Sequence, residues 1–204
     1  GPYTMQKWEP GVRASLKKNP SYYRPTNFDE VDFTVIADVT ARTNALTSGE
    51  VNYIDRIDLK TVELLKQNPD IEVTEVTGFG HYIFVMNVQQ KPFDNPDVRN
   101  ALKYAIDREA IKRKVFQGYA KVGNDNPIAP SIKFATNPEP LHGYDPDKAK
   151  ELLKKAGVEN LTVDLSVAEA AFGGAVDAGQ LFADSAKAAG ITINVVKEAN
   201  DSYW

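Results

Sequence analysis

Apolar residues recur at helical spacing through the stretch 91–119, and its polar residues fall where helices begin and end. Asn95 can accept a backbone N–H as an N-cap, and Pro96 fits the first helical position. Asp107 can cap a second helical segment, and Gly118 can end it. The apolar residues of both segments share helical faces that need a packing partner: Val98, Ala101, Leu102, Ala105, Ile106, Ala110, Ile111, Val115 and Phe116. The pattern predicts a core helix here, or two helices joined by a kink.

Strands and helices alternate along the rest of the chain. Pro10-Gly11 predicts a turn between two short extended runs, and a Pro-rich connector at 127–140 is too long for a tight turn. Strands are predicted at 28–37, 71–76, 82–86, 161–167 and 190–196. Helices are predicted at 38–49, 58–66, 145–157 and 179–189. This alternation predicts a mixed α/β (α+β) fold in which helices flank a mixed sheet.

Composition narrows the classes of protein. A chain of 204 residues can form one domain or two small ones, and a net charge of −4 argues against nucleic acid as a partner. No apolar run approaches the roughly 20 residues of a membrane helix. The absence of cysteine excludes disulfides and thiolate chemistry within this sequence. The first residues have no signal-peptide pattern, and Gly1-Pro2 is either native or a cloning scar.

Several runs resemble one protein family. FVMN at 84–87 followed by VQQKPFDNPDVRNALKYAIDREAI resembles extracytoplasmic solute-binding proteins of the dipeptide, oligopeptide and nickel type, the receptors of ABC importers. Asn95-Pro96 stands where Asp-Val-Arg is more usual in that family, and Asn52 replaces a usual Asp. Further matching runs are WEPG at 8–11, ALTSGEVNYIDRI at 45–57 and YDPDKAKELLKKAGV at 144–158. The resemblance covers essentially this whole chain and only part of a family member, and it favours native first residues.

The resemblance implies a function. Residues 1–204 would form one ligand-binding lobe of a two-lobed periplasmic receptor, without the N-terminal lobe and the C-terminal remainder. Such a receptor closes on a small molecule or peptide and delivers it to membrane permease subunits, as a monomer and without cofactor or catalysis. Peptide is the commonest ligand in the family, while nickel complexes, oligosaccharides and opine-like compounds stay open. In relatives, residues after the glycine-rich break face the ligand, so Phe79, Gly80, His81 and Tyr82 are the candidate ligand-binding residues.

Other chemistry finds little support in the sequence. His81 and His142 lack a helical histidine partner, which predicts no metal site. The sequence alone favours His81 as a surface residue at a strand end, and a side chain that points into a cleft is the alternative. Gly173-Gly174 is favoured as a flexible hinge or loop, and an anion held at the helix start is the alternative. The basic cluster Lys112 to Lys114 is expected to be a solvated face. No catalytic residue is predicted. The alternatives are a small hydrolase-like α/β enzyme that uses the carboxylates of Asp38, Asp55 or Asp58, and a non-catalytic interaction module.

Overall fold

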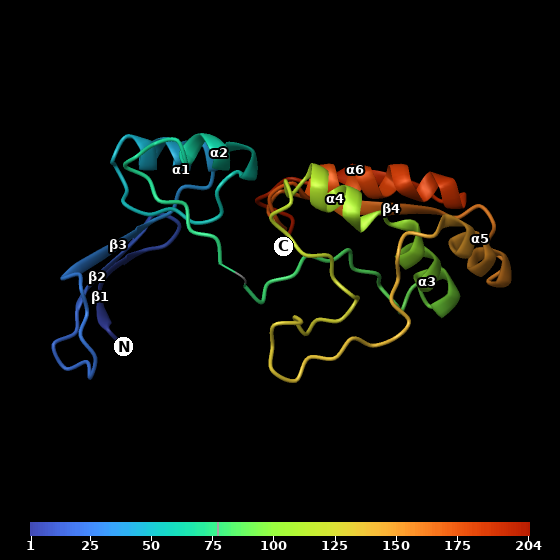
Figure 1. Ribbon diagram of the computed structural model, residues 1–204, viewed down its shortest axis with the longest axis horizontal. Coiled ribbons are helices and arrows are strands. Elements are labelled where there is room, and N and C mark those ends of the chain that lie inside the picture. Colours follow the sequence, from blue (N-terminus) through green and yellow to red (C-terminus); the bar gives the residue numbers. More distant parts are fainter. Residues whose placement is uncertain (77) are drawn as a thin grey trace. The chain divides into compact units, whose positions relative to one another are not determined.

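The computed structural model describes residues 1–76 and 78–204 (Figure 1). The chain divides into two compact units, residues 1–58 and residues 59–204. The predicted mixed α/β class is confirmed. Within the described residues, the strands form two small sheets, one of three strands and one of two. The expectation that residues 1–204 act as one ligand-binding lobe stays a prediction.

The first unit is an antiparallel sheet followed by a helix. Its strands, in the order β1-β2-β3, are β1 (Tyr3–Glu9), β2 (Arg13–Lys18) and β3 (Glu30–Thr34). The turn predicted at Pro10-Gly11 joins β1 to β2, and Gly11 has a positive φ of 74° that suits glycine. Helix α1 (Val39–Thr47) begins as predicted at Asp38, whose Oδ1 accepts the N–H of Ala41 at 2.7 Å.

The second unit contains the two helices predicted from the stretch 91–119. Oδ1 of Asn95 accepts the N–H of Asp97 at 2.9 Å, and Pro96 occupies the first turn of α3 (Pro96–Ala105). The backbone of Ile106 is extended, which breaks the helix. Asp107 then caps α4 (Arg108–Lys114) by accepting the N–H of Ala110. The kinked-helix prediction is confirmed, because each half carries its own cap.

A βαβ unit forms the other half of the second unit's core. Strands β4 (Thr162–Val167) and β5 (Thr192–Lys197) are parallel and are connected by α6 (Ala175–Ala186). A Cβ on Gly179 would lie 3.0 Å from Cγ1 of Val167, so glycine lets α6 lie close against this sheet. The remaining elements are η1 (Leu59–Thr61), α2 (Val62–Leu65), α5 (Pro146–Lys155) and η2 (Lys187–Ala189). Buried apolar side chains of α3, α4, α5, α6 and β5 form one core.

Two strands predicted in the second unit are not formed. The runs 71–76 and 82–86 are not strands, since no strand of the described residues pairs with either run. The side chains of the second run still alternate: Phe84 and Met86 pack on the core, whereas Ile83 and Val85 are exposed. A strand needs a hydrogen-bonded partner as well as alternation, and the pattern alone does not supply one.

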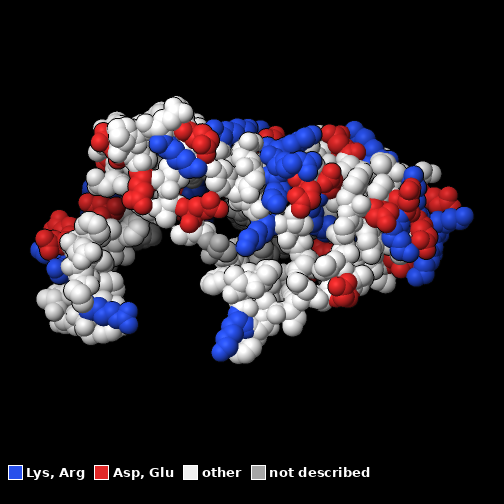
Figure 2. Space-filling model, viewed as in Figure 1, with Lys and Arg blue, Asp and Glu red and all other residues white. Residues whose placement is uncertain are grey.

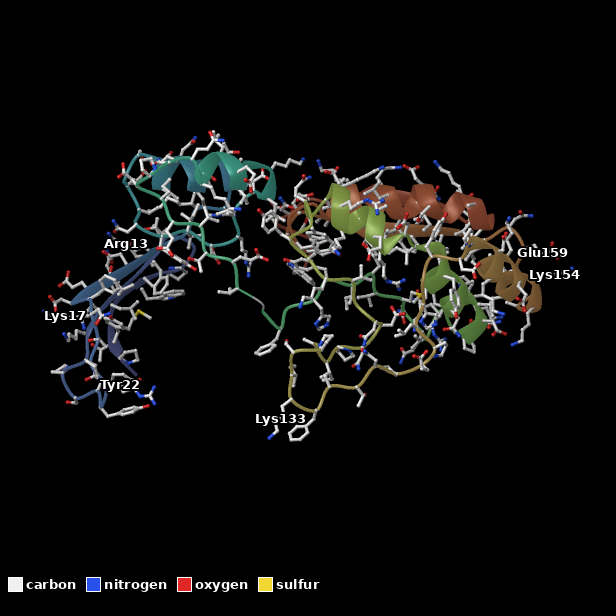
Figure 3. The ribbon with its side chains drawn as sticks, in the orientation of Figure 1. Arg13, Lys17, Tyr22, Lys133, Lys154 and Glu159 are labelled. Atoms are coloured by element: carbon white, nitrogen blue, oxygen red, sulfur yellow. The ribbon has the colours of Figure 1, made fainter. Side chains whose placement is uncertain are left out.

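The prediction for α6 starts too late, because the helix begins at Ala175 and not at Gly179. The connector between α4 and α5 is irregular as predicted. Nδ2 of Asn124 donates to Oδ1 of Asn137 at 2.5 Å, and Nδ2 of Asn126 donates to the carbonyl of Thr136 at 3.1 Å, which closes residues 124–137 into a connector loop. Lys133 lies at the outer turn of this loop (Figure 3). Within the described residues, no helix is long and apolar enough to cross a membrane.

Candidate ligand-binding site

The carboxyl ends of the parallel strands bring two loops of the second unit together. Strand β4 ends at Val167 and β5 ends at Lys197. Beyond these ends, Oδ1 of Asn200 accepts the N–H of Ala170 at 3.0 Å, which ties the loop after β5 to the loop after β4. Ligands of open α/β sheets bind outside the carboxyl ends of parallel strands. This edge is therefore the place in the second unit where a ligand is first expected.

Three aromatic rings stack in the same unit. The ring centroid of Tyr82 lies 4.3 Å from that of Phe172, which belongs to the loop after β4, with an interplanar angle of 19°. The Tyr82 ring also stacks on Phe116, which follows α4, at 5.6 Å and 15°. Phe116 and Phe172 pack against the core, whereas Tyr82 is 61% exposed. This aromatic cluster (Tyr82, Phe116 and Phe172) therefore presents a supported, partly open tyrosine to solvent.

The start of α6 carries an internal anion. The N–H of Gly174 donates to Oε2 of Glu169 at 2.6 Å, and the N–H of Val176 donates to Oε1 of the same carboxylate at 3.3 Å. Gly174 has a positive φ of 84°, and a Cβ there would collide with Val115. The hypothesis of an external anion at Gly173-Gly174 is corrected, because Glu169 already satisfies these helix-start N–H groups.

The four predicted site residues have different surroundings. Tyr82 is part of the aromatic cluster. Its stacking on Phe172 places it beside the loop that follows β4. Phe79, Gly80 and His81 are exposed in the irregular segment before it, and none of the three belongs to the cluster. Sequence reasoning missed Glu169 and Phe172. Phe172 immediately before Gly173-Gly174, and the acidic Glu169 four residues before Gly173, were the available signal.

The second histidine has a structural environment. The His142 side chain is only 9% exposed, and its Nδ1 lies 2.8 Å from Oδ2 of Asp125, an ion-pair distance without the alignment of a hydrogen bond. Nη2 of Arg108 donates to the other oxygen of Asp125 at 2.8 Å, and its Nη1 donates to the carbonyl of His142 at 3.0 Å. Burial lowers the pKa of His142, and the charges of Lys103 and Arg108 add to this effect while Asp125 opposes it. Arg108 thus ties Asp125 and the backbone of His142 to α4.

Two of the carboxylates considered for an enzyme, Asp38 and Asp55, have structural partners. Asp38 caps α1, and Asp55 lies 3.8 Å from Nε of Arg56. Among residues 1–76 and 78–204, no group of three or more His, Asp or Glu side chains is arranged to hold a metal ion. Figure 2 shows Lys and Arg side chains gathered over α4, where Arg113 and Lys114 are exposed in the last turn, as expected for a solvated face.

A hollow of about 630 Å³ lies where α3 begins and α5 ends. Two of its polar side chains are already engaged, since Asn95 caps α3 and Asp97 lies 3.0 Å from Nζ of Lys155. None of the residues that line the hollow belongs to the aromatic cluster. The lining residues are Lys91, Pro92, Asp94, Asn95, Pro96, Asp97, Val98, Ala156 and Val158. We therefore place the candidate site at the aromatic cluster and not in this hollow.

Parallel strands joined by a close-packed helix thus place an exposed tyrosine near their carboxyl ends, where small molecules bind in open α/β sheets. The family described as bacterial extracellular solute-binding proteins, family 5, middle region, matches residues 1–204, and the chain belongs to this family. Its members are extracytoplasmic binding proteins of ABC transporters and are not catalysts.

Relatives and solved structures agree with this assignment. The glutathione-binding protein GsiB of Escherichia coli O6:K15:H31 (strain 536 / UPEC) is 38% identical over 162 residues, covering 78% of this chain and 31% of GsiB. DppA from Helicobacter pylori, in complex with the peptide STSA, is 27% identical, with a TM-score of 0.82 over 100% of this chain and 39% of DppA. NikA from Staphylococcus aureus, in complex with Ni(L-His)2, is 25% identical, with a TM-score of 0.79 over 98% of this chain and 43% of NikA. The chain thus spans about a third of the length of the curated relatives it matches.

Proposed function

We propose that residues 1–204 belong to the receptor component of an ABC importer and contribute one wall of its site for a small peptide-like solute. The observation that carries this proposal is the exposed Tyr82 ring, held by Phe172 and Phe116 near the carboxyl ends of β4 and β5. A stacked tyrosine offers a flat apolar face and one hydroxyl, which suits a ligand that combines apolar and polar groups. The relatives support the ligand class, since GsiB is named for glutathione and DppA was solved with a peptide.

The mechanism is capture and delivery without covalent change. A ligand held by two lobes loses most of its water contact, whereas one wall alone leaves it largely exposed. Ligand contacts that exist only in the closed state would drive closure, and membrane permease subunits would receive the closed, monomeric form on the extracytoplasmic (periplasmic) side. Phe79, Gly80 and His81 precede Tyr82 directly and are proposed as further contacts of the same ligand.

Calorimetry on the full-length protein that contains this chain tests the proposal. Glutathione, a dipeptide and Ni(L-His)2 serve as probes, and mass spectrometry of the recovered probe checks that it is chemically unchanged. Tyr82→Ala is expected to weaken binding of the preferred probe about tenfold. The control Tyr53→Ala removes an 81% exposed tyrosine of the first unit and should leave affinity unchanged. Equal affinities for wild type and Tyr82→Ala would place the ligand elsewhere, and a chemically altered probe would favour the enzyme alternative.

A further inference from the structure

The three-stranded sheet of the first unit has two chemically different faces. Residues that pair directly across antiparallel strands lie on the same face of the sheet. One row across the sheet is Trp8, Ala14 and Phe33, and the next row on that face is Met5, Leu16 and Val31. We call these six residues the apolar sheet face.

The opposite face is charged. Its cross-strand rows combine Lys7 with Ser15 and Asp32, and Glu9 with Arg13 and Thr34. Nζ of Lys7 lies 2.6 Å from Oε1 of Glu9, and Nε of Arg13 lies 3.7 Å from Oε2 of the same residue. Figure 3 labels Arg13 and Lys17, two members of this face in β2. This face is suited to water, as one side of many antiparallel sheets is.

Half of the apolar sheet face is exposed. Met5 is 55% exposed, and Trp8 and Phe33 are each 63% exposed, whereas Leu16 and Val31 are half-buried and Ala14 is buried. The only fully buried apolar residues of the first unit are Ala14 and Ala45. A small sheet gains its stability by burying an apolar face against another layer, and two alanines do not supply such a core. The first unit is therefore incomplete on this side.

We propose that the apolar sheet face is a docking surface for the part of the same polypeptide that lies outside residues 1–204. The length of that part supports this occupant, because this chain corresponds to only 31% of GsiB and 39% of DppA. The partner surface is apolar and carries few charges. Lys18, whose side chain is on the same side as the six residues, already lies 3.7 Å from Asp29, so the face offers little attraction to an acidic membrane or an acidic protein.

Site-directed photo-crosslinking identifies the occupant in the full-length protein. Phe33 is replaced by the photoreactive residue p-benzoylphenylalanine, and its neighbour Asp32, on the opposite face, is replaced in the same way as the matched control. Irradiation at Phe33 is expected to form a link within one chain to a peptide outside residues 1–204, mapped by mass spectrometry. The Asp32 variant is expected to form no such link. Replacement of Met5 repeats the test from a second position if the Phe33 variant folds poorly.

Three outcomes would overturn the proposal. A crosslinked species of twice the monomer mass would assign the face to a second copy of the protein. A link confined to residues 1–204 would show that this chain covers its own sheet. Equal, weak reaction at Phe33 and Asp32 would show that the face stays in water in the complete protein. Each of these outcomes leaves the proposed ligand-binding role of Tyr82 intact, so failure of the two proposals can be told apart.

Discussion

The rings of Tyr82 and Phe172 stack at a centroid distance of 4.3 Å although the two residues belong to distant parts of the chain. Tyr82 lies before the first core helix, and Phe172 follows a strand near the end of the second unit. Phe172 therefore supports the exposed ring from behind. A ligand that contacts Tyr82 would therefore depend on Phe172 to hold the tyrosine ring in place.

We expect Phe172→Ala to weaken ligand binding by the full-length protein by about three- to tenfold, because loss of an aromatic stack costs about 0.5–1.5 kcal/mol. Phe172→Tyr keeps the ring and should retain affinity. Phe134→Ala serves as the control, since Phe134 is 87% exposed in the connector loop. Calorimetry with the preferred probe measures all three variants. Unchanged affinity for Phe172→Ala would show that ligand binding does not depend on a Tyr82 ring held by Phe172.

Asn95→Ala is expected to lower the free energy of unfolding by about 1 kcal/mol, because the N–H of Asp97 loses its acceptor at the start of α3. Asn160→Ala changes an exposed asparagine between α5 and β4 and should have little effect. Urea titration followed by circular dichroism gives both values. Equal free energies of unfolding for Asn95→Ala and Asn160→Ala would show that the Asn95 cap does not stabilise α3.

Leu102→Ala should destabilise the protein by about 2–5 kcal/mol, since Leu102 is 5% exposed in the core of the second unit. Leu141→Ala removes the same atoms from a residue that is 50% exposed. The same titration is expected to show a far smaller change for Leu141→Ala. Comparable losses would mean that the packing of α3 is misassigned.

Stability should fall as the pH drops below about 6.5, the pKa of an unfolded histidine, because burial lowers the pKa of His142 in the folded protein. Above that pH, His142 is neutral in both states and its contribution is fully present. Below it, the unfolded chain binds the proton more readily, so the contribution is lost as the pH falls through the folded pKa. His142→Gln should flatten this dependence in urea titrations at about pH 7.5 and 5.5. His81→Gln changes an exposed histidine and should retain the slope.

Local signals made the helices predictable. Asn95 and Asp107 cap within three residues of themselves, so the sequence around each already contains both partners of the hydrogen bond. Glu169 accepts N–H groups five and seven residues away across Gly173-Gly174, and that longer reach hid the true start of α6. The run 82–86 alternates like a strand but lacks a pairing strand in the described chain, because pairing is decided by distant residues.

The candidate site was predictable only in part for the same reason. Tyr82 was found from its place after a glycine-rich break. Its supports, Phe116 and Phe172, come from a helix end and a strand-end loop whose proximity depends on the completed core. Phe116 was read as a helix-face residue, and nothing nearby in sequence linked it to Tyr82.

The closed base of the connector loop has a practical consequence. The bond between the Asn124 and Asn137 side chains, and the bond from the Asn126 side chain to the carbonyl of Thr136, fix the distance that the loop must span. Additional residues or a dye at the outer turn, beside Lys133, would change the loop's length without pulling on α4 or α5. This turn is therefore a suitable attachment point for a fluorescent reporter or an affinity tag, because it lies away from both the aromatic cluster and the apolar sheet face in the sequence.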